Sequence, residues 1–461
     1  AVFSPWLKQP RHMAFPVSLL SGKSVTISNI RNTRPAVKQL RVAAESLLGI
    51  GIEQLIFEGQ VLGDTQELHP QALPTHVVAL AKAAFLAARP CYGYAFSLVR
   101  GDGSLVAWGD PSAGGASPSW ENPGARPERR VRQVAASARA FAAVLEDGSV
   151  ISWGMREFGA DSYEVRDLLV DVQEVVASHG AFAARLANGH VVSWGNPLYG
   201  GNQSLLVRAK LRDVHFIEAS AEAFAALRRD GQVVTWGHPE SGGCMGPVQE
   251  QLRDVSALKA SYGAFAALRC DGRVVTWGDD TFGGDSVEVQ SQLQEVVALE
   301  ASQAAFAALR SDGSVVTWGR CHGTTAQDVL RDNGGTVLAA VRVKASARAF
   351  AAVLQSGAVR CWGDPELGGD CSQVKDQLRE VSELHATHGA FAAILQNGQV
   401  VTWGHPDYGA DSSNVELKNV VQVQASYGAF AAITGDGQVI TWGHPGSGGD
   451  SSAVKEQLQG V

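Results

Sequence analysis

The dipeptide Trp-Gly recurs along most of this chain at a nearly constant interval. Successive tryptophans of this pair are 45, 41, 42, 41, 41, 44, 41 and 39 residues apart, and they are nine of the chain's eleven tryptophans. They are Trp108, Trp153, Trp194, Trp236, Trp277, Trp318, Trp362, Trp403 and Trp442. A fixed period of roughly 20 to 50 residues marks a repeat protein, in which each unit buries its hydrophobic face only against its neighbours.

Each unit contains two further recurring features. A Gly-containing turn such as Asp312-Gly313 precedes each tryptophan, and a short Ala/Phe run precedes each turn. In one unit, residues 296–302, 305–309 and 315–318 are expected to form three short strands. We expect the Asp-Gly and Asn-Gly pairs to form two-residue type I′ hairpin turns, which need positive φ at both central residues.

Short strands, one hairpin per unit and no long helix predict a mainly β protein, a β-propeller of about nine repeats of ~41 residues. Three arrangements fit: a nine-bladed ring, a smaller ring with outlying units, and a ring that does not close. A strand near Val77 to Leu80 is expected to complete the ring on its N-terminal side. Residues after Trp-Gly, as in 285–296, are expected to form a one- or two-turn helix capped by Asp285 or Ser286, with a four-residue strand as the alternative.

The repeat resembles the regulator of chromosome condensation repeat over about 370 residues. The shared string is Val-x-Ala-Ser-x-x-Ala-Phe-Ala-Ala-Leu-x-x-Asp-Gly-x-Val-Val-Thr-Trp-Gly, as at residues 258–278 with small variations. The family's His-Ser/Thr before the second strand is Ala-Phe here, and its Gly-Gln-Leu-Gly signature is Gly-Gly-Asp-Ser or Gly-Ala-Asp-Ser. The resemblance implies a propeller that binds other proteins. The short period resembles that of the three-stranded blades of the propeller-type β-lactamase inhibitor more than that of the longer blades of the regulator of chromosome condensation family.

Residues 15–81 resemble ubiquitin, an α+β fold of the β-grasp type. Residues 21–27 match its first hairpin, 36–48 its amphipathic helix and 55–62 the following strand and turn. The resemblance implies that Leu20 and Ile56 belong to a hydrophobic recognition patch. The domains expected are therefore an extended N-terminal arm at 1–14, a ubiquitin-like domain at 15–81 and a repeat propeller at 82–461. This layout resembles HERC-like proteins, although no HECT domain follows the repeats.

Charge and cysteine content exclude several functions. The net charge of −8 is the balance of +4 in residues 1–90 and −12 in residues 91–461, and an acidic propeller disfavours nucleic-acid binding. The longest apolar stretch, residues 77–88, is interrupted by Lys82 and is shorter than the ~20 residues of a membrane span. The six cysteines form no C-x-x-C pair and no zinc spacing, so ordinary reduced thiols are expected.

Recurring polar residues have structural explanations. His238, His405 and His444 share the position after Trp-Gly on separate units, which favours loop capping over a metal ring. Aspartates recur after Gly-Gly or Gly-Ala, where helix capping explains them: Asp161, Asp285, Asp370, Asp411 and Asp450. No catalytic set, phosphate-binding loop or cofactor motif rises above the repeat. We expect no enzyme activity, no cofactor and no metal.

Irregular segments on a regular scaffold are where partner contacts are expected. Two insertions, residues 110–130 and 320–343, interrupt the repeat, and the first includes Trp120, Arg126, Arg129 and Arg130. Trp6 lies in the N-terminal arm, which is expected to dock on a neighbour or to stay mobile.

The sequence thus predicts a non-catalytic protein-interaction scaffold, with the ubiquitin-like domain and a propeller face binding different proteins in ubiquitin signalling. The alternative is an accessory subunit of a large organellar assembly such as a photosynthetic membrane complex, which involves peripheral membrane association. The chain begins at Ala1, which allows for a removed targeting peptide, so cytoplasmic and organellar locations both stay open.

Overall fold

The computed structural model describes residues 103–116, 130–321, 325–332 and 334–452, and, before residue 103, the strands alone. Contacts divide the chain into two units. One consists of Ala1–Phe85 and Val99–Ser104 with the last residue, and the other of Leu86–Leu98 and Leu105–Gly460. No helix of the described residues is long and apolar enough to cross a bilayer.

The first unit contains a five-stranded mixed sheet. Its strands are β1 (Phe15–Leu19), β2 (Ser24–Ile27), β3 (Ile52–Phe57), β4 (Gln60–Val61) and β5 (Val77–Ala81), in the order β2-β1-β5-β3-β4. β1 pairs with β2 antiparallel and with β5 parallel, and β3 pairs antiparallel with both β5 and β4. The expectation that residues 77–80 complete the propeller is therefore wrong, because β5 is the central strand of this sheet. The helix expected at 36–48 lies outside the described residues.

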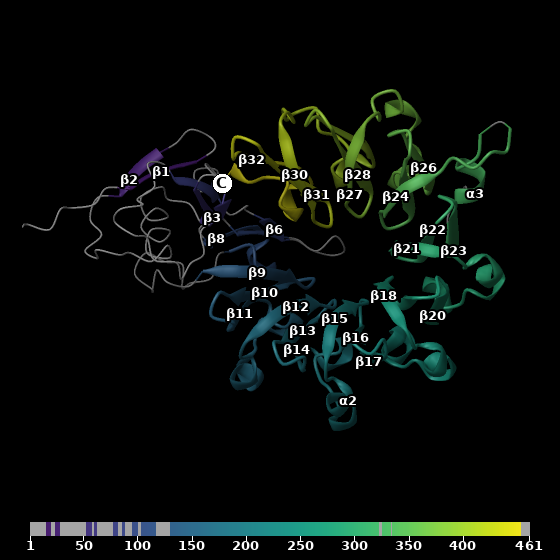
Figure 1. Ribbon diagram of the computed structural model, residues 1–461, viewed down its shortest axis with the longest axis horizontal. Coiled ribbons are helices and arrows are strands. Elements are labelled where there is room, and N and C mark those ends of the chain that lie inside the picture. The colour runs from purple at the N-terminus through teal and green to yellow at the C-terminus, as the bar shows by residue number, and fades with distance from the viewer. Residues whose placement is uncertain are drawn as a thin grey trace, which may run out of the picture. The chain divides into compact units, whose positions relative to one another are not determined.

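The second unit is built from three-stranded antiparallel sheets that follow one another along the chain, nine of them in the described residues (Figure 1). We number these blades 1 to 9. Their strands are β6 (Phe85–Ala87), β7 (Ala95–Val99), β8 (Leu105–Gly109); β9 (Val131–Ala136), β10 (Ala140–Leu145), β11 (Val150–Gly154); β12 (Val172–Ala177), β13 (Ala181–Leu186), β14 (Val191–Gly195); β15 (Val214–Ala219), β16 (Ala223–Arg228), β17 (Val233–Gly237); β18 (Val255–Ala260), β19 (Ala264–Arg269), β20 (Val274–Gly278); β21 (Val296–Ala301), β22 (Ala305–Arg310), β23 (Val315–Gly319); β24 (Ala340–Ala345), β25 (Ala349–Leu354), β26 (Val359–Gly363); β27 (Val381–Ala386), β28 (Ala390–Leu395), β29 (Val400–Gly404); β30 (Val420–Ala425), β31 (Ala429–Thr434), β32 (Val439–Gly443).

The Ala/Phe run is the middle strand of each blade, and its small side chains let neighbouring blades approach closely. In blade 5, Phe265 lies opposite Trp277 in the strand register, and the two rings stack with centroids 5.3 Å apart. Phe265 is fully buried, as are the alanines beside it. Burying one such aromatic side chain contributes roughly 1.5 to 3 kcal/mol, and every blade repeats this pair. The Phe and Trp columns are therefore part of the packed core of the blades.

The hairpin turns differ from the expected type I′. In blade 2 the amide of Gly148 donates to the Leu145 carbonyl, and the amide of Leu145 donates to the Ser149 carbonyl, which makes a three-residue turn. Only Gly148 has positive φ (78°), as expected for a type I turn followed by a left-handed residue. The Asp147 carboxylate accepts the amide of Ser149 at 2.9 Å. This side-chain bond replaces the second left-handed residue that a type I′ turn requires.

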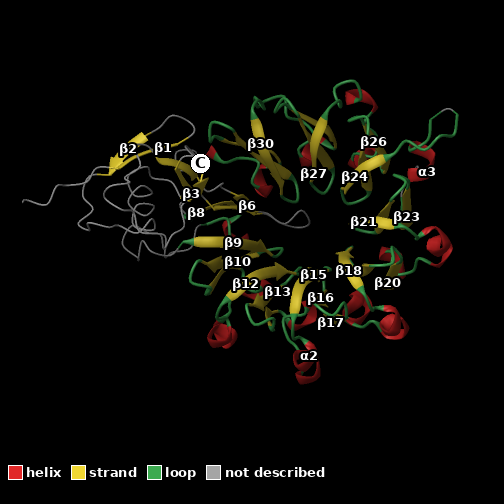
Figure 2. Ribbon diagram, in the orientation of Figure 1, coloured by secondary structure: helices red, strands yellow, loops and turns green. Residues whose placement is uncertain are grey.

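Short helical turns follow each Trp-Gly on the outside of the blades (Figure 2). The first set spans Pro111–Ala113, Arg156–Phe158, Pro197–Tyr199, Pro239–Gly243, Asp280–Phe282, Pro365–Leu367, Pro406–Tyr408 and Pro445–Ser447. The second set spans Tyr163–Leu168, α2 (Leu205–Lys210), Gly246–Gln251, Val287–Gln292, α3 (Ala326–Val329) and Ser372–Val374. The helix expected after Trp-Gly is thus confirmed, and the Asp285 carboxylate caps it by accepting the Val287 amide at 2.8 Å.

Every blade except blade 7 is joined to the preceding one by a tryptophan hydrogen bond. The Trp277 indole N–H donates to the carbonyl of Gly242 in blade 4 at 3.0 Å, and Gly242 has φ of +90°. A Cβ on Gly242 would lie 2.5 Å from the Phe265 ring, so only glycine fits. The same bond runs from Trp108 of blade 1 to Gly448, which follows the last strand of blade 9, at 3.0 Å. The ring therefore closes with nine blades, which decides among the three arrangements that the sequence left open.

Candidate functional site

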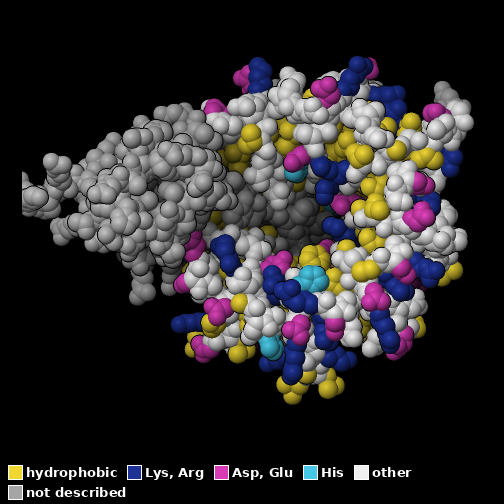
Figure 3. Space-filling view, in the orientation of Figure 1, with side chains coloured by type: hydrophobic (Ala, Val, Ile, Leu, Met, Phe, Trp, Pro, Cys, Tyr) yellow, Lys and Arg dark blue, Asp and Glu magenta, His cyan; other side chains and the backbone are white. Residues whose placement is uncertain are grey.

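The first strands of the blades surround a central channel. A cavity of ≈ 520 Å³ is lined by residues of β9, β12, β15, β18, β21, β24, β27 and β30, most of them the Ala-Ser pair that ends each first strand. Basic, acidic and histidine side chains gather around this opening in the space-filling view (Figure 3). The channel is thus a polar cavity whose walls consist mostly of small side chains.

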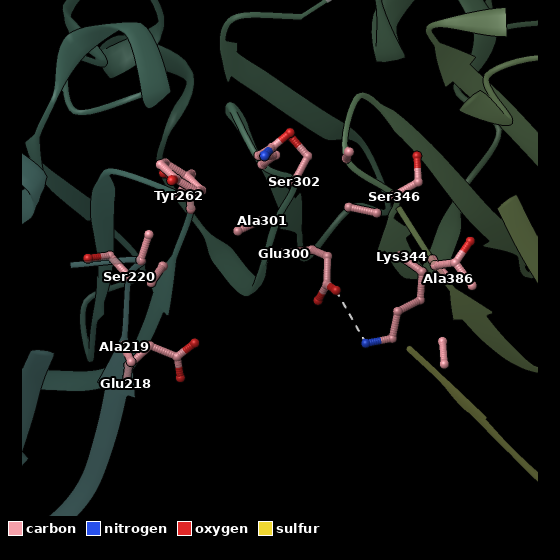
Figure 4. A pocket seen from close by; sticks show the side chains of 18 of the residues that line it. Glu218, Ala219, Ser220, Tyr262, Glu300, Ala301, Ser302, Lys344, Ser346 and Ala386 are labelled. Atoms are coloured by element: carbon pink, nitrogen blue, oxygen red, sulfur yellow. Dashed lines mark hydrogen bonds and ion pairs between the residues drawn. The ribbon is translucent and has the colours of Figure 1, made fainter. Parts of the chain in front are cut away.

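Ionisable residues occupy one equivalent first-strand position in five consecutive blades, and four of the five line the cavity. The position just before the Ala-Ser pair holds Glu218, Lys259, Glu300, Lys344 and His385. The Lys344 ammonium lies 3.2 Å from the Glu300 carboxylate of the preceding blade. Figure 4 shows both side chains, and that of Glu218, directed into the cavity. We name these five residues the channel column.

Two members of the channel column, Glu218 and His385, have shifted pKa values. Burial raises the pKa of Glu218 to about 7, and the Glu300 and Glu174 carboxylates add to the rise, whereas Lys259 opposes it. Burial also lowers the pKa of His385, against the Glu383 carboxylate 3.1 Å away. Glu218 therefore exchanges its proton near neutral pH.

A partial ring of backbone hydrogen bonds links eight blades at one mouth of the channel. In seven of them, blades 2 to 8, the residue after the first-strand Ser or Thr donates its amide to the carbonyl of the equivalent residue in the next blade, at distances of 2.7 to 3.1 Å. The ring consists of Ala138, His179, Ala221, Tyr262, Gln303, Ala347, His388 and Tyr427. We name it the mouth ring. Because each member is held by its neighbours, its side chains project from a rigid base.

Aromatic and cationic side chains concentrate at this mouth. A groove of ≈ 430 Å³ is lined by Tyr262, Phe282, Arg320, Arg348, His388 and Tyr427, with Thr281, Gln303 and Ala304. The rings of His388 and Tyr427 lie 4.6 Å apart, and those of Tyr262 and Phe282 lie 5.3 Å apart. These aromatic side chains are half-buried, and both arginines are exposed. Tyr262 and Gln303 line both the groove and the channel, so the two cavities are adjacent.

Burial lowers the pKa of His388, and the positive charge of Arg348 lowers it further. A neutral imidazole between tyrosines is therefore favoured at neutral pH. The groove thus presents flat aromatic faces and two guanidinium groups, and it holds no nucleophile with a paired general base. In the described part of the chain no group of three or more His, Cys, Asp or Glu is placed to hold a metal ion.

The recurring polar residues are structural. Each of the five repeat aspartates accepts the amide two residues further on, as Asp161 does from Tyr163 at 3.0 Å. The predicted capping by histidine is seen at His405, whose Nδ1 accepts the Asp407 amide at 3.2 Å. His238 makes no such bond and lies 3.7 Å from Glu222, and His444 has no capping bond either. The capping prediction is therefore correct for one of the three histidines.

Most residues predicted to contact partners lie outside the described part of the chain: Trp6, Leu20, Trp120, Arg126 and Arg129. Ile56 is on β3, opposite Val78 of β5 and Val61 of β4. Arg130 is half-buried and precedes β9, and its carbonyl accepts the Glu146 amide. This set of contact residues therefore stays a prediction.

Arg320 in the second insertion does belong to the mouth groove. The same insertion interrupts the tryptophan pattern, because the Trp362 indole N–H has no hydrogen-bond partner among the described residues. The remaining groove residues were not predicted from sequence. A signal was present, since the residue after Ala-Ser is His, Tyr or Gln in five repeats while the surrounding positions hardly vary.

No family model and no curated protein matches the chain. Among solved structures, yeast RCC1 (Prp20) bound to Kap60 is 16% identical, over 76% of this chain and 88% of that chain, with a TM-score of 0.40. Prp20p from Saccharomyces cerevisiae, studied with its binding to Gsp1p and histones, is 20% identical over 51% and 72%, with a TM-score of 0.35. The CRINKLY WD40 ectodomain of the Arabidopsis thaliana receptor kinase ACR4 is 17% identical over 60% and 96%, with a TM-score of 0.37. At these TM-scores the propeller assignment rests on the chain's own nine blades and their closure.

Proposed function

We propose that this protein is a non-catalytic scaffold that binds a segment of another protein at the mouth groove. The observation that carries the proposal is the concentration of half-buried Tyr262, Phe282, His388 and Tyr427 beside exposed Arg320 and Arg348. Aromatic residues and arginine are enriched at the centres of protein interfaces, where they supply large contact areas and bidentate hydrogen bonds.

The mouth ring favours binding without rearrangement. The groove side chains stand on a backbone that is hydrogen-bonded from blade to blade, so little conformational entropy remains to be lost when a partner docks. The adjacent channel cavity, of ≈ 520 Å³, has room for one inserted side chain. The Glu218 carboxylate makes this cavity suited to a basic or protonated group.

The test is site-specific photo-crosslinking of the full chain in cells that produce it. A photoreactive residue replaces Thr281, which is exposed in the groove, or Glu288, which is exposed on the outer helix of the same blade. We expect a discrete crosslinked protein from position 281 and not from position 288, and its loss on adding Tyr427→Ala and Arg348→Ala. The same products from both positions, or none from position 281, contradict the proposal. Crosslinking only within one large membrane assembly favours the accessory-subunit alternative.

The proposal extends to the N-terminal unit as a ubiquitin-like domain that takes part in ubiquitin signalling. Its support is the sequence resemblance together with the β2-β1-β5-β3-β4 sheet, which has an opening hairpin at β1 and β2 and parallel pairing of the first and last strands. We expect Ile56→Ala in the full chain to weaken binding to an isolated ubiquitin-binding domain at least tenfold, as measured by calorimetry. Gln60→Ala on β4 is the control. Unchanged affinity of Ile56→Ala removes the ubiquitin part of the proposal and leaves the mouth groove unaffected.

A further inference from the structure

A pair of hydroxyl side chains recurs in the outer part of the blades. The residue before the Trp-Gly tryptophan is hydrogen-bonded to a serine ten positions later, at the start of the second helical turn. The Oγ atoms are 2.9 Å apart in Thr276 and Ser286, 3.0 Å in Thr402 and Ser412, 2.9 Å in Thr441 and Ser451, and 3.3 Å in Ser152 and Ser162. The bond holds the loop after Trp-Gly against the third strand.

In blade 7 both members of this pair are cysteines. Cys361 precedes Trp362 on β26, and Cys371 follows ten residues later, just after Gly368-Gly369-Asp370. Both side chains are buried in one hydrophobic cluster, and both are free thiols. Because the two positions place their hydroxyls in hydrogen-bond contact in other blades, they place two sulfur atoms in contact here.

The two thiols are not equivalent. The hydrogen bond from the Cys361 thiol to the Cys371 sulfur lowers the pKa of Cys371, and the Arg360 guanidinium contributes in the same direction, whereas burial and the Asp370 carboxylate oppose the shift. Burial raises the pKa of Cys361. Asp370 and Ser372 on either side of Cys371 are exposed, so its sulfur lies just beneath the surface. Cys371 is therefore the nucleophilic member of the pair and Cys361 the resolving one.

We propose that Cys361 and Cys371 are a modification site that forms an intrachain disulfide on exposure to a peroxide. The Cys371 thiolate attacks one peroxide oxygen, the O–O bond breaks, and a sulfenic acid and hydroxide form, the latter taking up a proton to become water. The Cys361 sulfur then attacks the sulfenic sulfur, the S–O bond breaks, and a second water leaves with the proton of the Cys361 thiol. Two thiols have lost two electrons, and one hydrogen peroxide has been reduced to two waters.

The disulfide would tie the loop that connects blades 7 and 8. The ten-residue span from Cys361 to Cys371 contains Gly368, whose carbonyl accepts the Trp403 indole N–H at 3.1 Å. A Cβ on Gly368 would lie 2.5 Å from the Phe391 ring, so this loop already packs tightly on blade 8. A covalent link would fix this loop at the position where the hydroxyl pairs of other blades hold theirs.

The experiment is peptide mapping of the full-length protein after peroxide treatment. Remaining thiols are alkylated while the protein is unfolded, and trypsin then releases residues 361–375, which contain these two cysteines and no other. We expect this peptide to be unalkylated, lighter by two hydrogen atoms, and converted to the doubly alkylated form by prior reduction. Peptides containing Cys244 and Cys270, which are exposed, serve as internal references in the same digest.

The matched control is the double variant Cys361→Thr with Cys371→Ser, which restores the pair seen at Thr276 and Ser286. We expect peroxide to raise the thermal midpoint of the wild-type protein and not that of the double variant. The proposal is overturned if residues 361–375 remain doubly alkylated after peroxide treatment, or if Cys371 accumulates as sulfinic acid while Cys361 stays reduced. A disulfide that forms equally fast in urea-unfolded protein also overturns it, since the folded contact would then have no role.

Discussion

The indole N–H of Trp108 donates to the carbonyl of Gly448, 340 residues away, at 3.0 Å. The same bond joins every other neighbouring pair of blades except blades 6 and 7, as between Trp277 and Gly242. The propeller therefore closes by reusing its ordinary blade contact, and among the described strands the first and last blades exchange none.

The closing bond can be isolated with a matched tryptophan. Trp108→Phe keeps an aromatic ring against Phe96 but leaves the Gly448 carbonyl without its donor, which costs about 1 to 3 kcal/mol for a buried group. Trp362→Phe removes similar area but no hydrogen bond to a described residue. We expect Trp108→Phe to lower the free energy of unfolding more than Trp362→Phe in urea denaturation followed by circular dichroism. Equal losses would mean that the indole bond adds nothing to closure.

Replacing a turn glycine by alanine is expected to destabilise the protein for two separate reasons, backbone strain and steric contact. Gly231 has φ of +76°, and a Cβ there would lie 2.9 Å from Cα of Asp254 at the start of the next blade. Gly335 has φ of +80° and no atom within 4 Å of such a Cβ. Gly335→Ala should cost about 1 kcal/mol from backbone strain alone, and Gly231→Ala more. Thermal midpoints of the two variants measure the difference, and a larger loss for Gly335→Ala would contradict the packing account.

Glu218 should make stability fall between weakly acidic and neutral pH. Its pKa in the folded protein is about 7, against an ordinary 4.5, so the folded state binds this proton more tightly than the unfolded state. The resulting stabilisation is fully present below pH 4.5 and is lost as pH rises through 7. We expect Glu218→Gln to flatten the thermal midpoint over this range and to be more stable than wild type at pH 8. Glu288→Gln, at an exposed outer position, should keep the wild-type profile.

His388 offers a local probe of the mouth groove. Removing the positive charge of Arg348 by Arg348→Gln should raise the pKa of His388, while burial still keeps it below its ordinary 6.5. Histidine hydrogen–deuterium exchange read by mass spectrometry measures this shift. Arg253→Gln removes an equivalent charge from an exposed loop, where Arg253 pairs with Glu250, and should leave His388 unchanged. If the pKa of His388 is the same in both variants and in the wild type, the Arg348 charge does not influence it.

The type I′ conformation predicted from the sequence for the hairpin turns is wrong. Asp-Gly is typical of two-residue type I′ turns, yet here only the glycine is left-handed and the aspartate caps the turn instead. Left-handed backbone appears instead at the residue before the first strand in six blades, as at Asp171 with φ of 52°. The carbonyl of Asp171 accepts from Ala187 of its own blade, and the next amide, that of Val172, donates to Gly148 of the preceding blade. Contacts between blades, which a local pattern does not contain, select this conformation.

The sequence by itself determined the repeat, the three strands of each blade and the burial of the Phe and Trp columns, because these depend on local periodicity and on residue size. Only the tertiary structure decided that the ring closes through Trp108 and Gly448, and that Val77–Ala81 belongs to another sheet. It also placed Glu300 beside Lys344, 44 residues apart, and assembled the mouth groove from five blades. Equivalent positions of successive blades lie around one axis only when the blades are arranged radially. Side chains that are ~41 residues apart in the sequence therefore form a site only in the folded ring.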